Sequence, residues 1–145
     1  MSASAAESLS DGVPDWNRLV DRARAVMLNA YAPYSDFLVG AALQTADGMI
    51  FEGCNVENAA YPSGMCAERA AIAAAVSHGS RQFTALVIST LAEVPTPPCG
   101  MCRQVLEEFA PDLPVLSVTS SGAEARWTMS ELLPAAFTPT SLRHT

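Results

Sequence analysis

The sequence predicts an α/β protein, a three-layer α/β/α sandwich around a five-stranded mixed sheet. Segments with helical spacing of apolar residues alternate with short strand-like segments in the order α-β-β-α-β-α-β-β-α. One segment, 83–90, is a continuous apolar and β-branched run, which is typical of a strand buried on both faces. With 145 residues the chain has the size of one domain. We therefore expect a single domain over residues 14–140, preceded by a flexible lead-in at 1–13.

Capping and turn residues mark where the elements begin and end. Asp15 is expected to cap the first helix, Gly79 suits the position after the second, and Ser130 is expected to cap the last. "ADG" at 46–48 is a tight turn between two strands. The expected helices cover 16–30, 66–77, 100–109 and 131–137, and the expected strands cover 37–45, 49–58, 83–90, 113–118 and 124–128.

Charge and composition exclude several classes of partner. The net charge is −7, lysine is absent, and the eight arginines are scattered, so no basic stripe follows a phosphate backbone. Neither a Walker loop nor a G-x-G-x-x-G is present. No apolar run is long enough to cross a bilayer, and the N-terminal residues do not resemble a secretory signal. We expect a cytoplasmic protein that binds neither nucleic acid nor membrane and acts on a neutral or weakly charged small molecule.

Three of the four cysteines stand at expected helix openings. Cys99 and Cys102 form a C-x-x-C pair before one helix, and Cys66 opens another. In an intracellular chain such cysteines indicate a metal or a catalytic site before disulfides. Helix N-termini favour thiolates, and three thiolates suit zinc. Three protein ligands leave the fourth zinc position open for water, which is the catalytic pattern.

Two charged residues next to Cys66 fit the same site. Glu68 is two residues away, so it can meet a ligand of Cys66 only near the helix end. A carboxylate beside a metal-bound water can remove a proton and return it to a leaving group. Arg69 could hydrogen-bond the cysteine sulfurs and offset the negative charge of three thiolates.

These motifs resemble the zinc-dependent cytidine deaminases of the small, homotetrameric, three-cysteine kind. "CAER" followed by "PCGMC" is the three-cysteine form of the zinc-deaminase signature. "APYSDFLVGAAL", "GCNVENAAY" and "ELLPAAF" are also similar to that family, in its order and at similar spacing. The resemblance covers about Trp16 to Phe137. One departure is "YPSGMCAE", where many relatives carry "YGLTICAE".

The resemblance implies a fold, a reaction and a set of site residues. It implies a cytidine deaminase-like fold and hydrolysis of cytidine and 2′-deoxycytidine to uridine and 2′-deoxyuridine plus ammonia, in pyrimidine salvage. Zinc-activated water would attack while Glu68 shuttles protons, with one Zn²⁺ per subunit and active sites at the subunit interfaces of a homotetramer. The implied roles are zinc ligation by Cys66, Cys99 and Cys102, thiolate neutralisation by Arg69, base packing by Phe37, base-carbonyl contact by the Ala67 amide, 3′-hydroxyl binding by Asn55 and Glu57, and a Phe137 lent to a neighbouring subunit.

Other interpretations stay open from the sequence. A dithiol oxidoreductase would need only Cys99 and Cys102, and a closed structural zinc site would recruit Cys54. Within the deaminases, the closest alternative acts on an aminonucleoside antibiotic such as blasticidin S. His78 and His144 are not expected to bind metal, because one sits at a helix end and the other in the tail.

Overall fold

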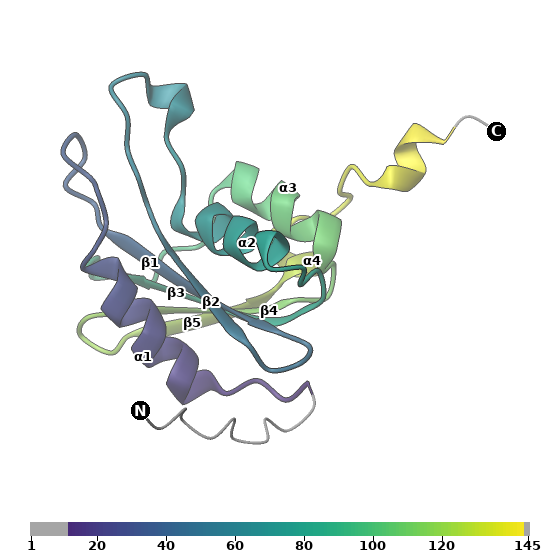
Figure 1. The fold of residues 1–145 in the computed structure, drawn as a ribbon, viewed down its shortest axis with the longest axis horizontal. Coiled ribbons are helices and arrows are strands. Elements are labelled where there is room, and N and C mark those ends of the chain that lie inside the picture. The colour runs from purple at the N-terminus through teal and green to yellow at the C-terminus, as the bar shows by residue number, and fades with distance from the viewer. Residues whose placement is uncertain (1–11, 144–145) are drawn as a thin grey trace.

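The central sheet has five strands in the order β2-β1-β3-β4-β5 (Figure 1). In this computed structural model, which describes residues 12–143, neighbouring strands are antiparallel except β3 and β4, which are parallel. The predicted five-stranded mixed sheet is thus confirmed. The strands are β1 (Val39–Thr45), β2 (Ile50–Cys54), β3 (Phe83–Thr90), β4 (Pro114–Thr119) and β5 (Glu124–Thr128).

Helices cover both faces of this sheet, which confirms the three-layer arrangement (Figure 1). The helices are α1 (Trp16–Met27), α2 (Ala67–Ser77), α3 (Gly100–Phe109) and α4 (Met129–Leu132), with 3-10 turns η1 (Tyr61–Ser63) and η2 (Pro139–Leu142). α1 packs on one face, and α2 and α3 pack on the other. Successive side chains of a strand point to opposite faces, so Ala42 packs under α1 whereas Ala41 and Leu43 pack under α2.

The parallel pair β3 and β4 determines where α3 begins. The chain leaves the carboxyl end of β3 at Thr90, crosses the proline-rich loop, and enters α3 at Gly100. Ligand sites in α/β sheets gather outside the carboxyl ends of strands. The start of α3 therefore lies where a site is expected.

Several elements are shorter than predicted. The first helix ends at Met27 and not at residue 30, and the first strand begins at Val39 and not at residue 37. The strand expected over 49–58 ends at Cys54, because Asn55 and Glu57 leave the sheet and hydrogen-bond through their backbones to Tyr31. The last helix is capped by Thr128, whose side chain accepts from the Glu131 amide, so the predicted Ser130 cap was wrong.

The same helix also ends early, at Leu132 and not at 137. Leu133 precedes Pro134, and the residue before a proline is disfavoured in helical conformation. Residues after it lead to η2, and this C-terminal segment projects away from the body of the molecule (Figure 1).

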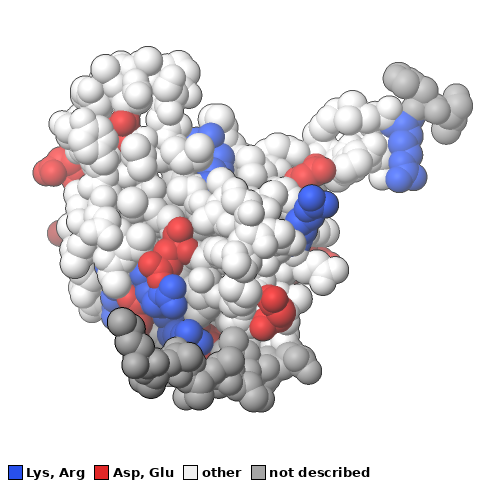
Figure 2. All heavy atoms as spheres, in the orientation of Figure 1, with Lys and Arg blue, Asp and Glu red and all other residues white. Residues whose placement is uncertain are grey.

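One face of the molecule carries little concentrated charge. On the face shown in Figure 2, acidic and basic side chains lie in small mixed groups within a mostly uncharged surface. Across residues 12–143, no helix has the length and apolarity needed to span a membrane. The lead-in predicted at 1–13 and the expectation for His144 fall almost wholly outside the described residues.

Candidate active site

Three thiols meet where α2 and α3 begin. Cys66 is the N-cap of α2 and Cys99 is the N-cap of α3, both with extended backbone, and Cys102 lies in the first turn of α3. The Cys99 side chain accepts a hydrogen bond from the Cys102 amide at 3.5 Å. The three sulfur atoms lie within 4.8 Å of one another, and they are the one such metal-binding group found in residues 12–143. The sequence-predicted trio is therefore brought together.

The sulfur spacing fits a tetrahedral zinc site. The Sγ atoms of Cys66 and Cys99 are 3.8 Å apart. Two sulfur ligands at a Zn–S distance of about 2.3 Å, held at the tetrahedral angle, stand about 3.8 Å apart. The set offers soft ligands only and leaves one coordination position unfilled by protein. The residues present thus fit a catalytic Zn²⁺.

Arg69 and the thiols share hydrogen bonds that favour a thiolate at Cys66. The hydrogen bond with Cys102, and further ones with Arg69 and Cys99, lower the pKa of the Cys66 thiol to about 5 despite its partial burial. The same bond with Cys66, with burial and the charge of Glu68, raises the pKa of Cys102 above its ordinary value. A coordinating thiol is deprotonated outright, so metal binding would release the Cys102 proton.

The guanidinium of Arg69 is placed against these sulfurs. Its Nη2 donates to Cys66 Sγ at 3.5 Å, and its Nε is buried without a hydrogen-bond partner among the described residues. Arginine therefore offers a further donor beside a group that becomes more negative when all three thiols ionise. This is the position that a charge-neutralising role requires.

Glu68 is buried beside the sulfur cluster. Its side chain is 5% exposed, and its Oε2 accepts from Cys102 Sγ at 3.7 Å. Burial is the largest cause that raises the pKa of this carboxyl, and the charge on Cys66 adds to it. A carboxyl with a raised pKa is suited to taking and releasing protons near neutral pH.

Gly53 sets how close α2 approaches the sheet, and the sequence analysis did not single it out. A Cβ at position 53 would stand 2.4 Å from the Ala67 carbonyl oxygen and 2.5 Å from the Ala71 amide nitrogen. Only glycine allows this approach, and it fixes the first turn of α2 with Glu68. An isolated glycine inside a strand pattern is the signal that points to such a contact.

The segment that follows β2 lies beside the cysteine loop. Val56 pairs with Met65 through two backbone hydrogen bonds of 2.9 Å, next to Cys66 in the chain. Asn55 joins this segment to the start of β1: its Oδ1 accepts from the Val39 amide at 2.8 Å and its Nδ2 donates to the Phe37 carbonyl at 2.7 Å. An amide side chain has two N–H and two lone pairs, so Asn55 keeps one of each for a ligand.

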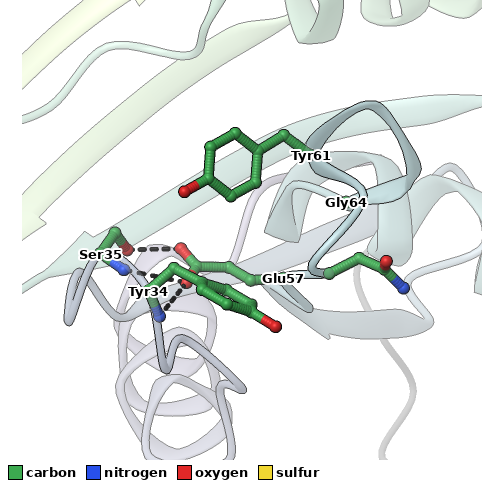
Figure 3. A pocket seen from close by; sticks show the side chains of 6 residues that line it. Tyr34, Ser35, Glu57, Tyr61 and Gly64 are labelled. Atoms are coloured by element: carbon green, nitrogen blue, oxygen red, sulfur yellow. Dashed lines mark hydrogen bonds between the residues drawn. The ribbon is translucent and has the colours of Figure 1, made fainter.

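Glu57 lines a pocket of about 390 Å³ together with Tyr34, Ser35, Asn58, Tyr61 and Gly64 (Figure 3). Its Oε1 accepts from the amides of Tyr34 and Ser35, each at 3.0 Å, and its Oε2 accepts from the Ser35 hydroxyl. The hydrogen bond from the Ser35 hydroxyl, followed by that from the Ser35 amide, lowers the pKa of the Glu57 carboxyl. Ser35 is a second residue that the sequence analysis missed, because a serine in a loop carries no distinctive signal.

The remaining predicted residues occupy three different settings. Ala67 is the first residue of α2 and is fully buried. Phe37 lies two residues before β1 and is exposed, at 39%. Phe137 is 60% exposed near the projecting C-terminal segment, and its carbonyl accepts a hydrogen bond from the Gln104 side chain at 2.9 Å.

Cys54, the alternative fourth ligand, and His78, which was not expected to bind metal, both lie outside the sulfur cluster. Cys54 is half-buried at the end of β2 and does not join the three-thiol group. His78 caps the end of α2, where its ring packs on Phe51 with the ring centres 5.3 Å apart. A closed site completed by Cys54 thus finds no support in this geometry.

Comparison with known proteins gives a consistent result. Residues 15–117 match the family described as the cytidine and deoxycytidylate deaminase zinc-binding region. A cytidine deaminase of Sporosarcina psychrophila is 44% identical over 131 residues, covering 90% of this chain and 96% of that protein. The crystal structure of cytidine deaminase from Burkholderia pseudomallei is similar with a TM-score of 0.81 and 44% identity, covering 83% of this chain and 98% of the other. A blasticidin-S deaminase of Bacillus cereus is 34% identical over 109 residues, or 69% of this chain and 76% of its own length.

Proposed function

Because the chain belongs to the family of zinc-binding cytidine and deoxycytidylate deaminases, we propose that it hydrolyses the amine of cytidine and 2′-deoxycytidine. The products are uridine or 2′-deoxyuridine and ammonia. The observation that carries this proposal is the sulfur cluster with Glu68 beside it: three Sγ atoms within 4.8 Å and a buried carboxylate oxygen 3.7 Å from Cys102.

Cys66, Cys99 and Cys102 hold one Zn²⁺ through their thiolates. Bound zinc supplies a Lewis acid that lowers the pKa of water into the neutral range. Arg69 offsets the charge of the three thiolates, since its Nη2 already donates to Cys66.

Glu68 moves the protons of the reaction. It takes one proton from the attacking water and delivers it to N3 of the base. It then takes the second proton of that water and delivers it to the amine nitrogen that leaves C4. The overall balance is cytidine plus water giving uridine plus ammonia. Burial of Glu68 supports this role, because the raised pKa lets one carboxyl act as base and then as acid.

The nucleoside is held by uncharged contacts. Phe37 packs against the base, and the Ala67 amide at the start of α2 donates to its carbonyl oxygen. Asn55 and Glu57 bind the 3′-hydroxyl of the sugar. The N–H and lone pair left on the Asn55 amide and the lone pair left on the Glu57 carboxylate support this role. The catalytic domain spans 14–140, of which the family match covers 15–117.

The active unit is a homotetramer in which Phe137 enters the pocket of a neighbouring subunit. Large apolar side chains are exposed around the site, and such groupings mark association surfaces. They include Tyr31, Tyr34, Val56, Tyr61, Met65 and Met101, and Phe137 near the C-terminal segment is exposed as well. The C-terminal segment that projects from the body is placed to reach another copy (Figure 1). Sedimentation of the purified protein tests the assembly, while the cytoplasmic location and the role in pyrimidine salvage stay predictions.

The activity is tested by following the ultraviolet spectrum of cytidine mixed with the purified protein, before and after treatment with a strong zinc chelator. We expect conversion to uridine, its loss on chelation, one zinc per chain by elemental analysis, and recovery with added Zn²⁺. Blasticidin S is assayed in parallel, since one relative is a deaminase of that compound. Faster conversion of blasticidin S than of cytidine would make blasticidin S the preferred substrate in place of cytidine. Conversion of cytidine that survives complete zinc removal would overturn the mechanism.

A further inference from the structure

The hydroxyl of Ser35 bonds to two groups at once. It donates to Oε2 of Glu57, and it accepts from the Phe37 amide at 3.0 Å (Figure 3 shows its bond to Glu57). Because the Phe37 N–H occupies the acceptor side of this hydroxyl, the hydroxyl proton is directed to the carboxylate. Ser35 therefore holds Glu57 in a defined orientation.

Glu57 has almost no freedom left once these bonds form. A carboxylate offers about four lone-pair sites, and three are taken by Tyr34 N–H, Ser35 N–H and Ser35 Oγ–H. The loop that supplies these donors adopts a costly conformation, since Asp36 has a φ of +56°. Such a conformation persists when its surroundings impose it, and it is typical of sites that position a ligand.

We propose that Ser35 is a positioning residue for recognition of the sugar: it orients the Glu57 carboxylate so that its remaining lone pair meets the 3′-hydroxyl of the nucleoside. This inference rests on the proposed function and on the sugar-binding role of Glu57. The hydroxyl also keeps Glu57 ionised, as the lowered pKa of that carboxyl indicates. Ser35 itself does not touch the reacting atoms.

The test compares cytidine with 3′-deoxycytidine, which lacks only the hydroxyl in question. In Ser35→Ala we expect the KM for cytidine to rise about tenfold, the size expected for a lost hydrogen bond to a charged group, with kcat within about twofold. The KM for 3′-deoxycytidine should stay within about twofold of the unmodified protein. Ser35→Thr keeps the hydroxyl and should restore the preference for cytidine, because residue 35 is exposed and has room for a methyl group.

Thr45 provides a matched control at the opposite end of β1. Its hydroxyl also donates to a carboxylate, that of Asp47, and also accepts a backbone amide, that of Met49. Thr45→Val removes the same kind of bond at the end of β1, whereas Ser35 lies in the loop before that strand. The substitution should lower the melting temperature without changing the KM of either substrate.

The outcomes separate this inference from the proposed function. If the unmodified protein fails to convert cytidine, the function and the role of Ser35 fall together. If it converts cytidine but Ser35→Ala raises the KM of both substrates equally, or of neither, only the role of Ser35 is overturned. A loss in Ser35→Ala that Ser35→Thr does not restore also overturns it.

Discussion

Gly53 and Ala67 lie so close together that no side chain fits between them: a Cβ at position 53 would stand 2.4 Å from the Ala67 carbonyl oxygen. β2 thereby sets the height of the first turn of α2 above the sheet. That turn carries Glu68, and Cys66 is the residue immediately before the turn. The site thus depends on a backbone contact made by a residue without a side chain.

Gly53→Ala should displace α2 and lower kcat by about tenfold or more, because small misplacements of reacting groups are costly. It should also destabilise the fold by about 1–3 kcal/mol through overpacking. Gly40→Ala is the control: a Cβ there would stand 2.1 Å from the Ala23 carbonyl oxygen in α1, on the opposite face of the sheet. For each variant, the loss of kcat is compared with the drop in melting temperature. If the two variants lose the same kcat for the same drop in melting temperature, the assigned role of Gly53 is contradicted.

Glu68→Gln keeps the shape of the side chain but cannot carry protons. We expect turnover of cytidine to fall by about a hundredfold or more, with zinc content unchanged. Glu108→Gln, which alters an exposed carboxylate on α3, is the control and should retain full activity. Near-normal turnover in Glu68→Gln would show that another group moves the protons.

Arg69→Ala should release zinc faster, because it removes the donor to Cys66 and the charge that offsets the thiolates. Substituting a residue that hydrogen-bonds a metal ligand typically lowers the affinity for the metal by about 10–100-fold. The rate of zinc transfer to a coloured chelator measures this, with the exposed Arg81→Ala as control. Identical rates of zinc release in the two variants would show that Arg69 does not stabilise the metal site.

Phe137→Ala should raise the KM for cytidine while leaving the sulfur cluster and its zinc intact. If Phe137 acts on a neighbouring subunit, oligomers that mix Phe137→Ala with Glu68→Gln chains should recover normal KM at some sites. In those sites one chain supplies Glu68 and the other supplies Phe137. If the KM does not recover in verified mixed oligomers, Phe137 acts within its own chain or serves only in packing.

Recognition of the 3′-hydroxyl should persist at acid pH. The Ser35 hydrogen bonds lower the pKa of Glu57 below its ordinary value of 4.5. A lowered pKa means that the charged acceptor is fully present above pH 4.5 and is lost only as the pH falls through the lower value. The ratio of KM for 3′-deoxycytidine to KM for cytidine should therefore stay constant as the pH is lowered to 4.5. In Ser35→Ala the ratio should begin to fall at a higher pH than in the unmodified protein. A ratio that already falls near neutral pH would contradict the contact.

Local patterns were enough to predict most elements of the fold. Strand 83–90 and helix 100–109 were predicted with the bounds that the structure shows, and Asp15 caps α1 as expected. Each of these signals lies within a few residues along the chain. The last helix was predicted wrongly because two local signals competed: Thr128 outcompeted Ser130 as the cap, and Pro134 ended the helix.

The sequence by itself determined the chemistry of the site, since Cys66, Glu68, Cys99 and Cys102 stand at helix starts that can be read from neighbouring residues. Only the tertiary structure decided how these starts meet, because the strand order and the packing of α2 and α3 on one face bring Cys66 within 3.8 Å of Cys99 across 33 positions. The same holds for Gly53 against α2 and for Ser35 against Glu57. Contacts between distant segments depend on packing and on backbone approach, and neither leaves a periodic pattern in the sequence.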